Sequence, residues 1–461
     1  MYKNIYFIGI GGIGMSAIAR YYNVKGFKVS GYDKTPSPLT HALEAEGIDV
    51  HYTDDISYIP TDIESTLVVY TPAIPKDMGE LVYVQEKGYR VIKRSRMLGE
   101  IAQGQRCMAV AGTHGKTTTS TLVSHLFTDS GEGCSAFLGG ISKNYDSNLL
   151  THANNVIVAE ADEFDRSFLQ LFPEIAVITS MDADHLDIYG DEAHIREAFK
   201  AFASQVSGTV IVKHGLDITP EDTKAAIMTY GYDTPEADFY AEPLEGGRFN
   251  LHYPGGIIED CIVGIPGWVN IENGTAAAAI ALTYGIAPEK IKAALASFSG
   301  VKRRFDMQVN KEGLVYIDDY AHHPNEISAA LSSIKNKYPD HRYTAIFQPH
   351  LYTRTRDFAP EFAEALSMVD RLILLDIYPA RELPIPGVTS QIIFDDVTAP
   401  EKVLISKEEL LGYIDGLSLG DKEVFVTLGA GDIDRLVGPL AELLTEKHKI
   451  ERKCLESGDI S

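Results

Sequence analysis

The chain has 461 residues, of which 45% are hydrophobic and 23% charged, a composition typical of globular proteins with two to four domains. Its formal net charge of -24 repels phosphate backbones and argues against nucleic acid as a partner. No apolar stretch reaches the roughly 18 residues that span a bilayer, so no membrane partner is expected. The 4 cysteines are scattered and no secretory signature is present, which predicts a cytoplasmic protein. The sequence leaves the oligomeric state open.

Short runs rich in valine and isoleucine alternate with helical patterns along the chain, as in "TLVVY", "NVIVAEAD" and "RLILLDI". Such runs are typical of buried parallel strands, so the predicted fold class is α/β. The runs form three groups, which predict domains over residues 1–104, 105–302 and 303–461. The polar stretch 446–461 is expected to be a frayed tail.

The first motif is "FIGIGGIGMS", where an apolar strand runs into a glycine-rich loop and a helical pattern follows. This order is typical of a loop that cradles a diphosphate at a helix N-terminus. Asp33 ends the second strand, where dinucleotide-binding folds place a ribose-binding acid; it either contacts a ribose or only completes its loop. Taken alone, the motif also fits a nicotinamide-dependent oxidoreductase.

A second phosphate loop follows in "CMAVAGTHGKTTTSTLVSHLF", which again reads strand, loop, helix. The strict Walker pattern has a glycine at the position of Val110. The other elements of a phosphate site remain, because the loop lies between a buried strand and a helix N-terminus, whose N–H groups and dipole favour phosphate. Lys116 is predicted to reach the β- and γ-phosphates, and the Thr117 hydroxyl to ligate Mg²⁺. Hydride transfer has no use for a separate ATP loop, which argues against the oxidoreductase.

Acidic residues follow two later strands, in "VIVAEADEFDRSF" and "VITSMDADHLD". Because open α/β sheets bind ligands beyond the carboxyl ends of their strands, these residues indicate a Mg²⁺ site beside the ATP phosphates. Glu160 and His185 are the preferred ligands, and the other acids of the two segments are weaker candidates. Lys200, on a later helical pattern, is by default a surface lysine.

Eight segments occur here in one order: "GIGGIGMS", "GTHGKTTT", "EADEFDRSF", "DADHLD", "GVKRRFD", "DDYAHHPNE", "FQPHLYTRT" and "GAGDI". Together they closely resemble the Mur ligases, and within that family the members that add L-alanine. The resemblance runs from Ile5 to about Ile433. It implies a Rossmann-like N-terminal domain for a UDP-sugar, a central P-loop-type ATPase domain with a mainly parallel sheet, and a Rossmann-like C-terminal domain for the amino acid.

The resemblance also implies roles for individual residues. The UDP-sugar is expected to lie against Gly11, Gly12, Gly14, Met15 and Ser16. ATP is expected to contact Gly112, Thr113, His114, Gly115, Lys116, Thr117, Thr118, Asn270 and Asn273, although Val269 stands where a histidine usually precedes the first asparagine. Asn273 alternatively reads as an N-cap of the alanine-rich helix. Mg²⁺ is expected on Thr117, Glu160 and His185, and Lys200 lies roughly where sister ligases carry a carbamylated lysine.

The remaining catalytic candidates come from the third domain and its entry. Arg304, beside Arg303, is expected to reach the γ-phosphate when the domains close. His322, His350 and Arg354 are expected in loops after strands, facing the cleft, with His323 beside the first of them. Leu351 replaces an arginine that is frequent in the family at that position.

The implied activity is ATP-dependent ligation of L-alanine to the lactyl carboxylate of UDP-N-acetylmuramate through an acyl phosphate, a step of peptidoglycan precursor synthesis, with ATP and Mg²⁺ as cofactors. The nearest alternative is a recycling ligase that adds a whole tripeptide to the same UDP-sugar. The form "FQPHLYTRT" favours alanine over the tripeptide. An oxidoreductase, or a non-enzymatic sensor of ATP or UDP-sugar, are alternatives from other classes.

Overall fold

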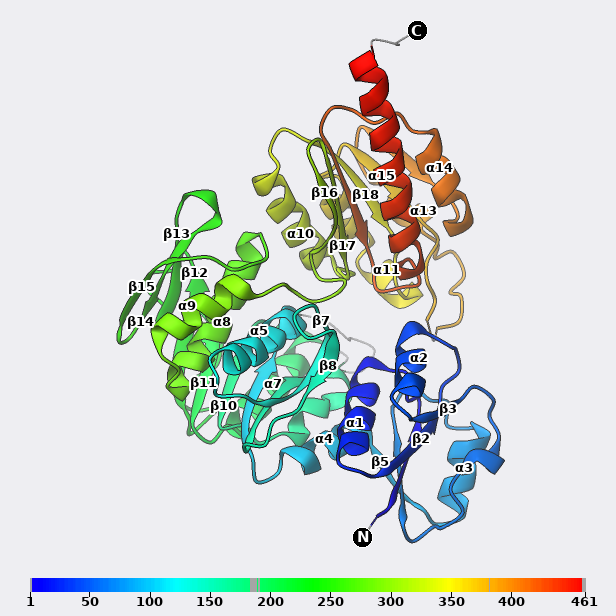
Figure 1. Cartoon of the computed structure of the whole chain (residues 1–461), viewed down its shortest axis with the longest axis vertical. Coiled ribbons are helices and arrows are strands. Elements are labelled where there is room, and N and C mark those ends of the chain that lie inside the picture. Colours follow the sequence, from blue (N-terminus) through cyan, green and yellow to red (C-terminus); the bar gives the residue numbers. More distant parts are fainter. Residues whose placement is uncertain (1, 183–188, 190, 381, 458–461) are drawn as a thin grey trace. The chain divides into compact units, whose positions relative to one another are not determined.

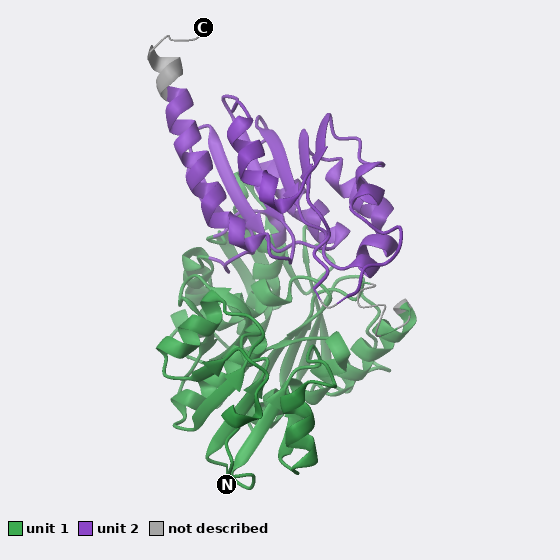
Figure 2. Cartoon of the chain, turned by 90° about the vertical axis from the view of Figure 1, so that its right-hand side faces the viewer, with its two compact units in different colours: residues 1–264, 270–299 green, residues 265–269, 300–461 purple. Residues whose placement is uncertain are grey.

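The computed structural model describes residues 2–182, 189, 191–380 and 382–457, and the chain forms two compact units (Figure 2). Unit 1 comprises residues 1–264 and 270–299, and unit 2 comprises residues 265–269 and 300–461. Two sheets belong to unit 1 and one to unit 2 (Figure 1). The predicted α/β class is confirmed, because each of the three sheets contains parallel strands that alternate with helices along the chain.

The first sheet is entirely parallel, with strand order β3-β2-β1-β4-β5. Its order reverses between β1 and β4, and folds of this kind bind ligands at such a point, beyond the carboxyl ends of the strands. The strands are β1 (Asn4–Ile8), β2 (Lys28–Tyr32), β3 (Asp49–His51), β4 (Thr66–Tyr70) and β5 (Arg90–Lys93). The helices are α1 (Ile13–Val24), α2 (Pro38–Ala45), the short η1 (Ile56–Tyr58), α3 (Gly79–Glu86) and α4 (Arg94–Ala102).

The second sheet has the strand order β15-β14-β13-β12-β11-β10-β6-β9-β7-β8 and is parallel except at its two ends. Its strands are β6 (Arg106–Ala111), β7 (Ser135–Ser142), β8 (Ser147–Leu150), β9 (Val156–Ala161), β10 (Ile175–Ile178), β11 (Thr209–Lys213), β12 (Ala226–Tyr232), β13 (Phe239–Pro243), β14 (Phe249–Tyr253) and β15 (Gly256–Cys261). Its helices are α5 (Lys116–Asp129), η2 (Phe164–Gln170), α7 (Glu192–Ser204), η3 (Glu245–Gly247), α8 (Trp268–Tyr284) and α9 (Pro288–Ser297).

The third sheet, in unit 2, has the order β16-β17-β21-β18-β19-β20, and only β16 is antiparallel. Its strands are β16 (Asp306–Lys311), β17 (Leu314–Asp319), β18 (Arg342–Phe347), β19 (Arg371–Leu374), β20 (Glu401–Leu404) and β21 (Glu423–Leu428). Its helices are α10 (Pro324–Lys337), α11 (Tyr352–Asp357), α12 (Ala359–Leu366), α13 (Gln391–Phe394), η4 (Lys407–Glu409), α14 (Leu410–Gly416) and α15 (Asp434–Ser457).

Within unit 1 the first two sheets share one hydrophobic core. Helix α1 of the first sheet packs against the β7–β8 hairpin of the second. The rings of Tyr21 and Phe137 meet there with centroids 5.3 Å apart. Because α1 follows the first glycine loop directly, the packing of this helix couples that loop to the central sheet.

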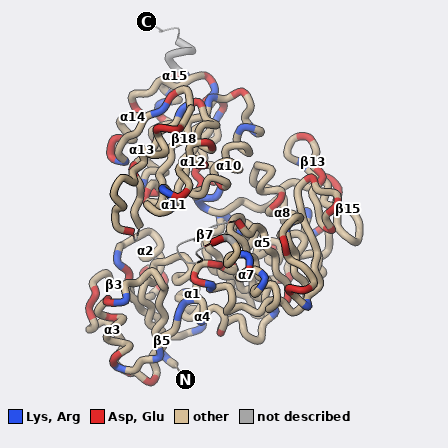
Figure 3. Tube along the Cα trace, turned by 180° about the vertical axis from the view of Figure 1, so that it is seen from behind, with Lys and Arg blue, Asp and Glu red and all other residues tan. Residues whose placement is uncertain are grey.

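One local expectation was wrong. The stretch 446–461 was expected to fray, but α15 continues through it as far as Ser457. His448 is 8% exposed, and Lys447 lies 3.7 Å from Glu451, so the helix is held by packing as well as by its own ion pair. Acidic residues are distributed along the described chain (Figure 3). Among the described helices, none combines the length and apolarity needed to cross a membrane.

Candidate active site

The second phosphate loop lies between the buried strand β6 and helix α5, as predicted. Two glycines are required by its backbone, because Gly112 has φ +138° and Gly115 has φ +80°. A Cβ on Gly112 would also lie 2.9 Å from the backbone nitrogen of Ser180. The loop therefore ends with backbone N–H groups at the start of α5, an arrangement that favours phosphate.

Lys116 begins α5, and its ammonium folds back onto the loop. It donates to the carbonyl of Gly112 over 2.6 Å and lies 2.8 Å from a carboxylate oxygen of Glu163, a residue that is 2% exposed. Burial opposes the charge on Lys116, but Glu163 and neighbouring acids outweigh it and hold the pKa of the ammonium above its usual range. The lysine is thus kept charged by a buried carboxylate.

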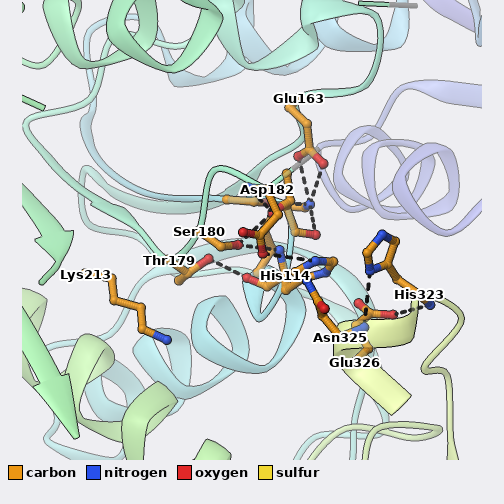
Figure 4. A network of polar contacts seen from close by, with 12 residues as sticks. His114, Glu163, Thr179, Ser180, Asp182, Lys213, His323, Asn325 and Glu326 are labelled. Carbon is orange, nitrogen blue, oxygen red and sulfur yellow. Dashed lines mark hydrogen bonds and ion pairs between the residues drawn. The ribbon is translucent and has the colours of Figure 1, made fainter. Parts of the chain in front are cut away.

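Thr113 and His114 of the loop are hydrogen-bonded to the segment that follows β10 (Figure 4). Ser180 Oγ accepts from the backbone N–H of His114 over 2.8 Å and lies 2.9 Å from Thr113 Oγ1. Thr179 donates to the His114 carbonyl, and the His114 ring lies 3.4 Å from the Asp182 carboxylate. These contacts pre-organise the loop, so little order has to be gained when a phosphate binds.

Two of the three predicted Mg²⁺ ligands come together. Thr117 Oγ1 donates to Glu160 Oε1 over 3.0 Å, and Glu160 Oε2 accepts from the backbone N–H of Gly139 over 3.0 Å. A hydroxyl beside a carboxylate at a phosphate loop fits Mg²⁺, which takes one or two protein oxygens and completes its shell with phosphates and water. The third predicted ligand, His185, lies outside the described residues, among which no cluster of three or more acidic, histidine or cysteine ligands occurs.

The asparagines of "VNIENGTAAAA" both lie in α8 and are 6–7% exposed. Asn273 reaches the loop, because its Oδ1 accepts from Thr119 Oγ1 over 3.2 Å and would lie 2.9 Å from a Cβ on Gly115. Asn273 is the sixth residue of α8, so the alternative interpretation as its N-cap is wrong. Between the asparagines, Glu272 forms an ion pair of 2.8 Å with Lys213. Thr118 is buried in the first turn of α5.

The first glycine loop is held by contacts with neighbouring segments. Asp33 Oδ2 accepts from the backbone N–H of Gly11 over 2.8 Å, so this acid shapes the loop. As whole residues, Met15 and Ser16 are at most 1% exposed and turn into the protein, so their expected contact with the UDP-sugar stays a prediction. A Cβ on Gly14 would lie 2.6 Å from Nη1 of Arg94, a basic group that the sequence pattern did not single out.

The remaining acids after β9 pair with basic groups of the first sheet. Asp162 lies 3.0 Å from Arg94, and Asp165 lies 2.6 Å from Lys93. They therefore join the first domain to the central one and are not arranged around Glu160 as metal ligands. Lys200 pairs with Asp217 at 3.0 Å and with Asp222 at 3.4 Å, as expected of a surface lysine.

In unit 2, the structure brings His322 and His350 together, with ring centroids 6.0 Å apart. His322 follows β17 and His350 follows β18, the two strands that flank β21, so both lie after strands as predicted. Arg354 is 7% exposed and lies in α11, which corrects its predicted placement in a loop. Leu351, the residue before α11, has φ +73°, a conformation that costs a non-glycine residue roughly 1–3 kcal/mol and is often found at functional sites.

Arg303 and Arg304, at the entry to the third domain, make different contacts. Arg303 donates to Asp318 over 3.2 Å and to the carbonyl of Gly429 over 2.8 Å, so it anchors the domain. The Arg304 guanidinium lies over the ring of Tyr320, 4.8 Å from its centroid. Nearby, burial raises the pKa of Asp319 to about 6, against the lowering effect of the Arg304 charge.

Three family models match consecutive parts of the chain. They are the Mur ligase family catalytic domain over residues 4–106, the Mur ligase middle domain over 110–281, and the Mur ligase glutamate ligase domain over 303–431. The chain belongs to the Mur ligase family. The three α/β domains expected from the resemblance are thereby confirmed.

Individual relatives of this Mur ligase cover nearly its full length. It is 51% identical to the UDP-N-acetylmuramate--L-alanine ligase of Porphyromonas gingivalis, over 96% of this chain and 99% of that protein. It is 52% identical to the ligase of the same name from Parabacteroides distasonis, over 96% and 97%. A crystal structure of UDP-N-acetylmuramate-alanine ligase MurC from Thermotoga maritima superposes with a TM-score of 0.81 at 26% identity, over 97% of this chain and 99% of that one. A murein peptide ligase from Psychrobacter arcticus shares the fold, with a TM-score of 0.70 at 22% identity, over 96% of this chain and 98% of that one.

Proposed function

We propose that this Mur ligase joins L-alanine to the lactyl carboxylate of UDP-N-acetylmuramate and converts ATP to ADP and phosphate. The observation that carries the proposal is the loop that ends in Lys116, with Thr117 held 3.0 Å from Glu160, in a chain about half identical to L-alanine ligases over nearly its whole length. A carboxylate is a poor acyl donor. Its activation by ATP as an acyl phosphate makes amide formation feasible.

In the proposed reaction, the lactyl carboxylate attacks the γ-phosphate of ATP, the bond from the γ-phosphorus to the bridging oxygen breaks, and ADP leaves as the acyl phosphate forms. The neutral amine of L-alanine then attacks the acyl carbon, and the tetrahedral intermediate releases phosphate and one amine proton to give the amide. Lys116 supplies positive charge to the β- and γ-phosphates, which take the place of Glu163 as its partner. A Mg²⁺ ion held by Thr117 and Glu160 would neutralise further phosphate charge.

The residues of unit 2 would serve the second half-reaction. Arg354 and the histidine pair His322 and His350 would offer cationic and hydrogen-bonding groups for the carboxylate and amine of the amino acid. Arg304, stacked on Tyr320, is the proposed partner of the γ-phosphate after closure. Closure also excludes water, which would otherwise hydrolyse the acyl phosphate. Since UDP-sugars and ATP are cytoplasmic metabolites, we place the reaction in the cytoplasm.

Phosphate release by the purified protein tests this function and its alternatives. Release that needs UDP-N-acetylmuramate, ATP, Mg²⁺ and L-alanine together is the expected result. Release with L-Ala-γ-D-Glu-meso-diaminopimelate in place of L-alanine would identify the tripeptide ligase instead. Reduction of NAD⁺ or NADP⁺ with a small substrate would identify an oxidoreductase, and binding of ATP or UDP-sugar with no turnover would identify a sensor.

A further inference from the structure

Asn148 on strand β8 is a fully buried polar residue that no step of the reaction uses. Its amide nitrogen donates to the carbonyl of Ile13 over 2.6 Å and to Ser16 Oγ over 2.9 Å. Both partners belong to the first turn of α1, directly after the first glycine loop. An asparagine of the central sheet therefore holds the beginning of the helix on which the diphosphate is expected.

The other end of the Asn148 side chain is also occupied. Its oxygen accepts from Nη1 of Arg20, which is 8% exposed and lies on α1. Arg20 in turn donates to the Glu46 carboxylate through Nε over 2.8 Å and through Nη2 over 2.6 Å. Arginine only donates and a carbonyl only accepts, so these partners settle which way the amide points. The network joins β8, α1 and the end of α2.

The hairpin that carries Asn148 also contacts Glu160, an expected Mg²⁺ ligand of the ATP site. Strand β7 pairs antiparallel with β8, with Phe137 opposite Leu149 and Ser142 opposite Ser147. Two residues beyond Phe137, the backbone N–H of Gly139 donates to Glu160 over 3.0 Å. One hairpin, whose pairing shifts register between Phe137 and Ser142, is thus bonded to α1 through a side chain of one strand and to Glu160 through the backbone of the other.

We infer that Asn148 is a positioning residue, which fixes α1 on the β7–β8 hairpin and so sets the bound UDP-sugar in register with the γ-phosphate of ATP. The inference rests on the proposed function, because it assigns the hairpin the task of aligning that function's two sites. Asn148 touches neither substrate. Its removal leaves each site intact but misaligns the two, and a misplacement of about 1 Å can cost on the order of 10²-fold in rate.

The test compares Asn148→Ala with the matched control Asn154→Ala. Asn154 also belongs to the central domain, and its amide also donates to two backbone carbonyls, those of Glu132 over 2.9 Å and Gly133 over 2.8 Å, neither of which belongs to α1. Asn154 is less buried than Asn148. For each variant, kcat is measured by phosphate release, and the Kd values for ATP and UDP-N-acetylmuramate by calorimetry. Amide hydrogen exchange in the first turn of α1 gives a readout that needs no substrate.

Asn148→Ala is expected to lower kcat at least ~10-fold, to keep both Kd values within about threefold, and to speed exchange at the start of α1. Asn154→Ala is expected to keep kcat within about twofold. A kcat for Asn148→Ala within twofold of the parent, or a loss that follows a weaker Kd, overturns the inference. If Asn148→Ala does not fold, Arg20→Lys removes the planar fork that joins Asn148 to Glu46 and must lower kcat in the same way. If the parent protein shows no turnover, the proposed function is refuted. Unchanged amide exchange at the start of α1 in Asn148→Ala separately refutes the role of Asn148 in fixing α1.

Discussion

Gly139→Ala tests the link between the metal ligands and the hairpin. Gly139 lies in β7 with an ordinary backbone conformation, so an alanine is not excluded by φ. An added Cβ would lie 2.6 Å from Cδ of Glu160, about 0.8 Å short of the 3.4 Å at which ordinary contact begins. The carboxylate must therefore move away, and it then loses the Gly139 N–H and its place beside Thr117.

The size of the effect follows from the bond that is lost. A hydrogen bond to a charged group is worth about 1.5–3 kcal/mol, and each 1.4 kcal/mol is a factor of ten in an equilibrium. The Mg²⁺ concentration that half-saturates phosphate release is therefore expected to rise about 10- to 100-fold. Binding of UDP-N-acetylmuramate is expected to stay within about threefold, because the first glycine loop is not displaced.

The assay is phosphate release over a Mg²⁺ titration, with Gly412→Ala as the control. Gly412 lies in α14, where an added Cβ meets nothing within 4 Å, so the control is expected to stabilise the helix by about 0.5–1 kcal/mol and leave the Mg²⁺ dependence unchanged. A Gly139→Ala protein that folds and shows the parent's Mg²⁺ dependence would refute the assignment of Glu160 as a metal ligand.

Lys116→Ala is expected to abolish ADP release while calorimetry still detects UDP-N-acetylmuramate binding; substantial ATP-dependent ligation by this variant would contradict the loop assignment. Glu163→Gln removes the charge that competes with phosphate for Lys116, so ATP is expected to bind several-fold tighter in calorimetry. The free protein is expected to lose about 1–3 kcal/mol of stability. Weaker ATP binding would show instead that Glu163 supports the bound nucleotide. Asp319, with its pKa raised by burial to about 6, keeps its proton in the native state to a higher pH than in the unfolded state. The stability it contributes is thus complete below about pH 4 and is lost as the pH rises through about 6, a change on the order of 3 kcal/mol. Thermal unfolding of Asp319→Asn should lack this part of the pH dependence, and parallel curves for parent and variant would refute it.

Local sequence patterns were sufficient for the strands and the two phosphate loops. The reason is that a buried parallel strand needs a continuous apolar run, and a loop at a helix N-terminus needs glycine at positive φ, as at Gly112 and Gly115. The pairing of Thr117 with Glu160 could also be anticipated. Parallel strands end at one edge of the sheet, and β9 lies next to β6.

Other features depend on contacts between distant parts of the chain. Glu163 meets Lys116 across 47 positions, Arg94 meets Asp162 across 68, and Asn148 meets Ile13 across 135. No periodicity or spacing marks such partners, because an acid, an arginine or an asparagine in a short segment is most often exposed to solvent. Likewise, Ser16 belongs to the glycine motif in the sequence, yet its side chain is turned into the protein by the packing of α1. The sequence by itself thus determined which chemistry the chain carries, and the tertiary structure decided which side chains are available for it, since burial is a property of the packed chain.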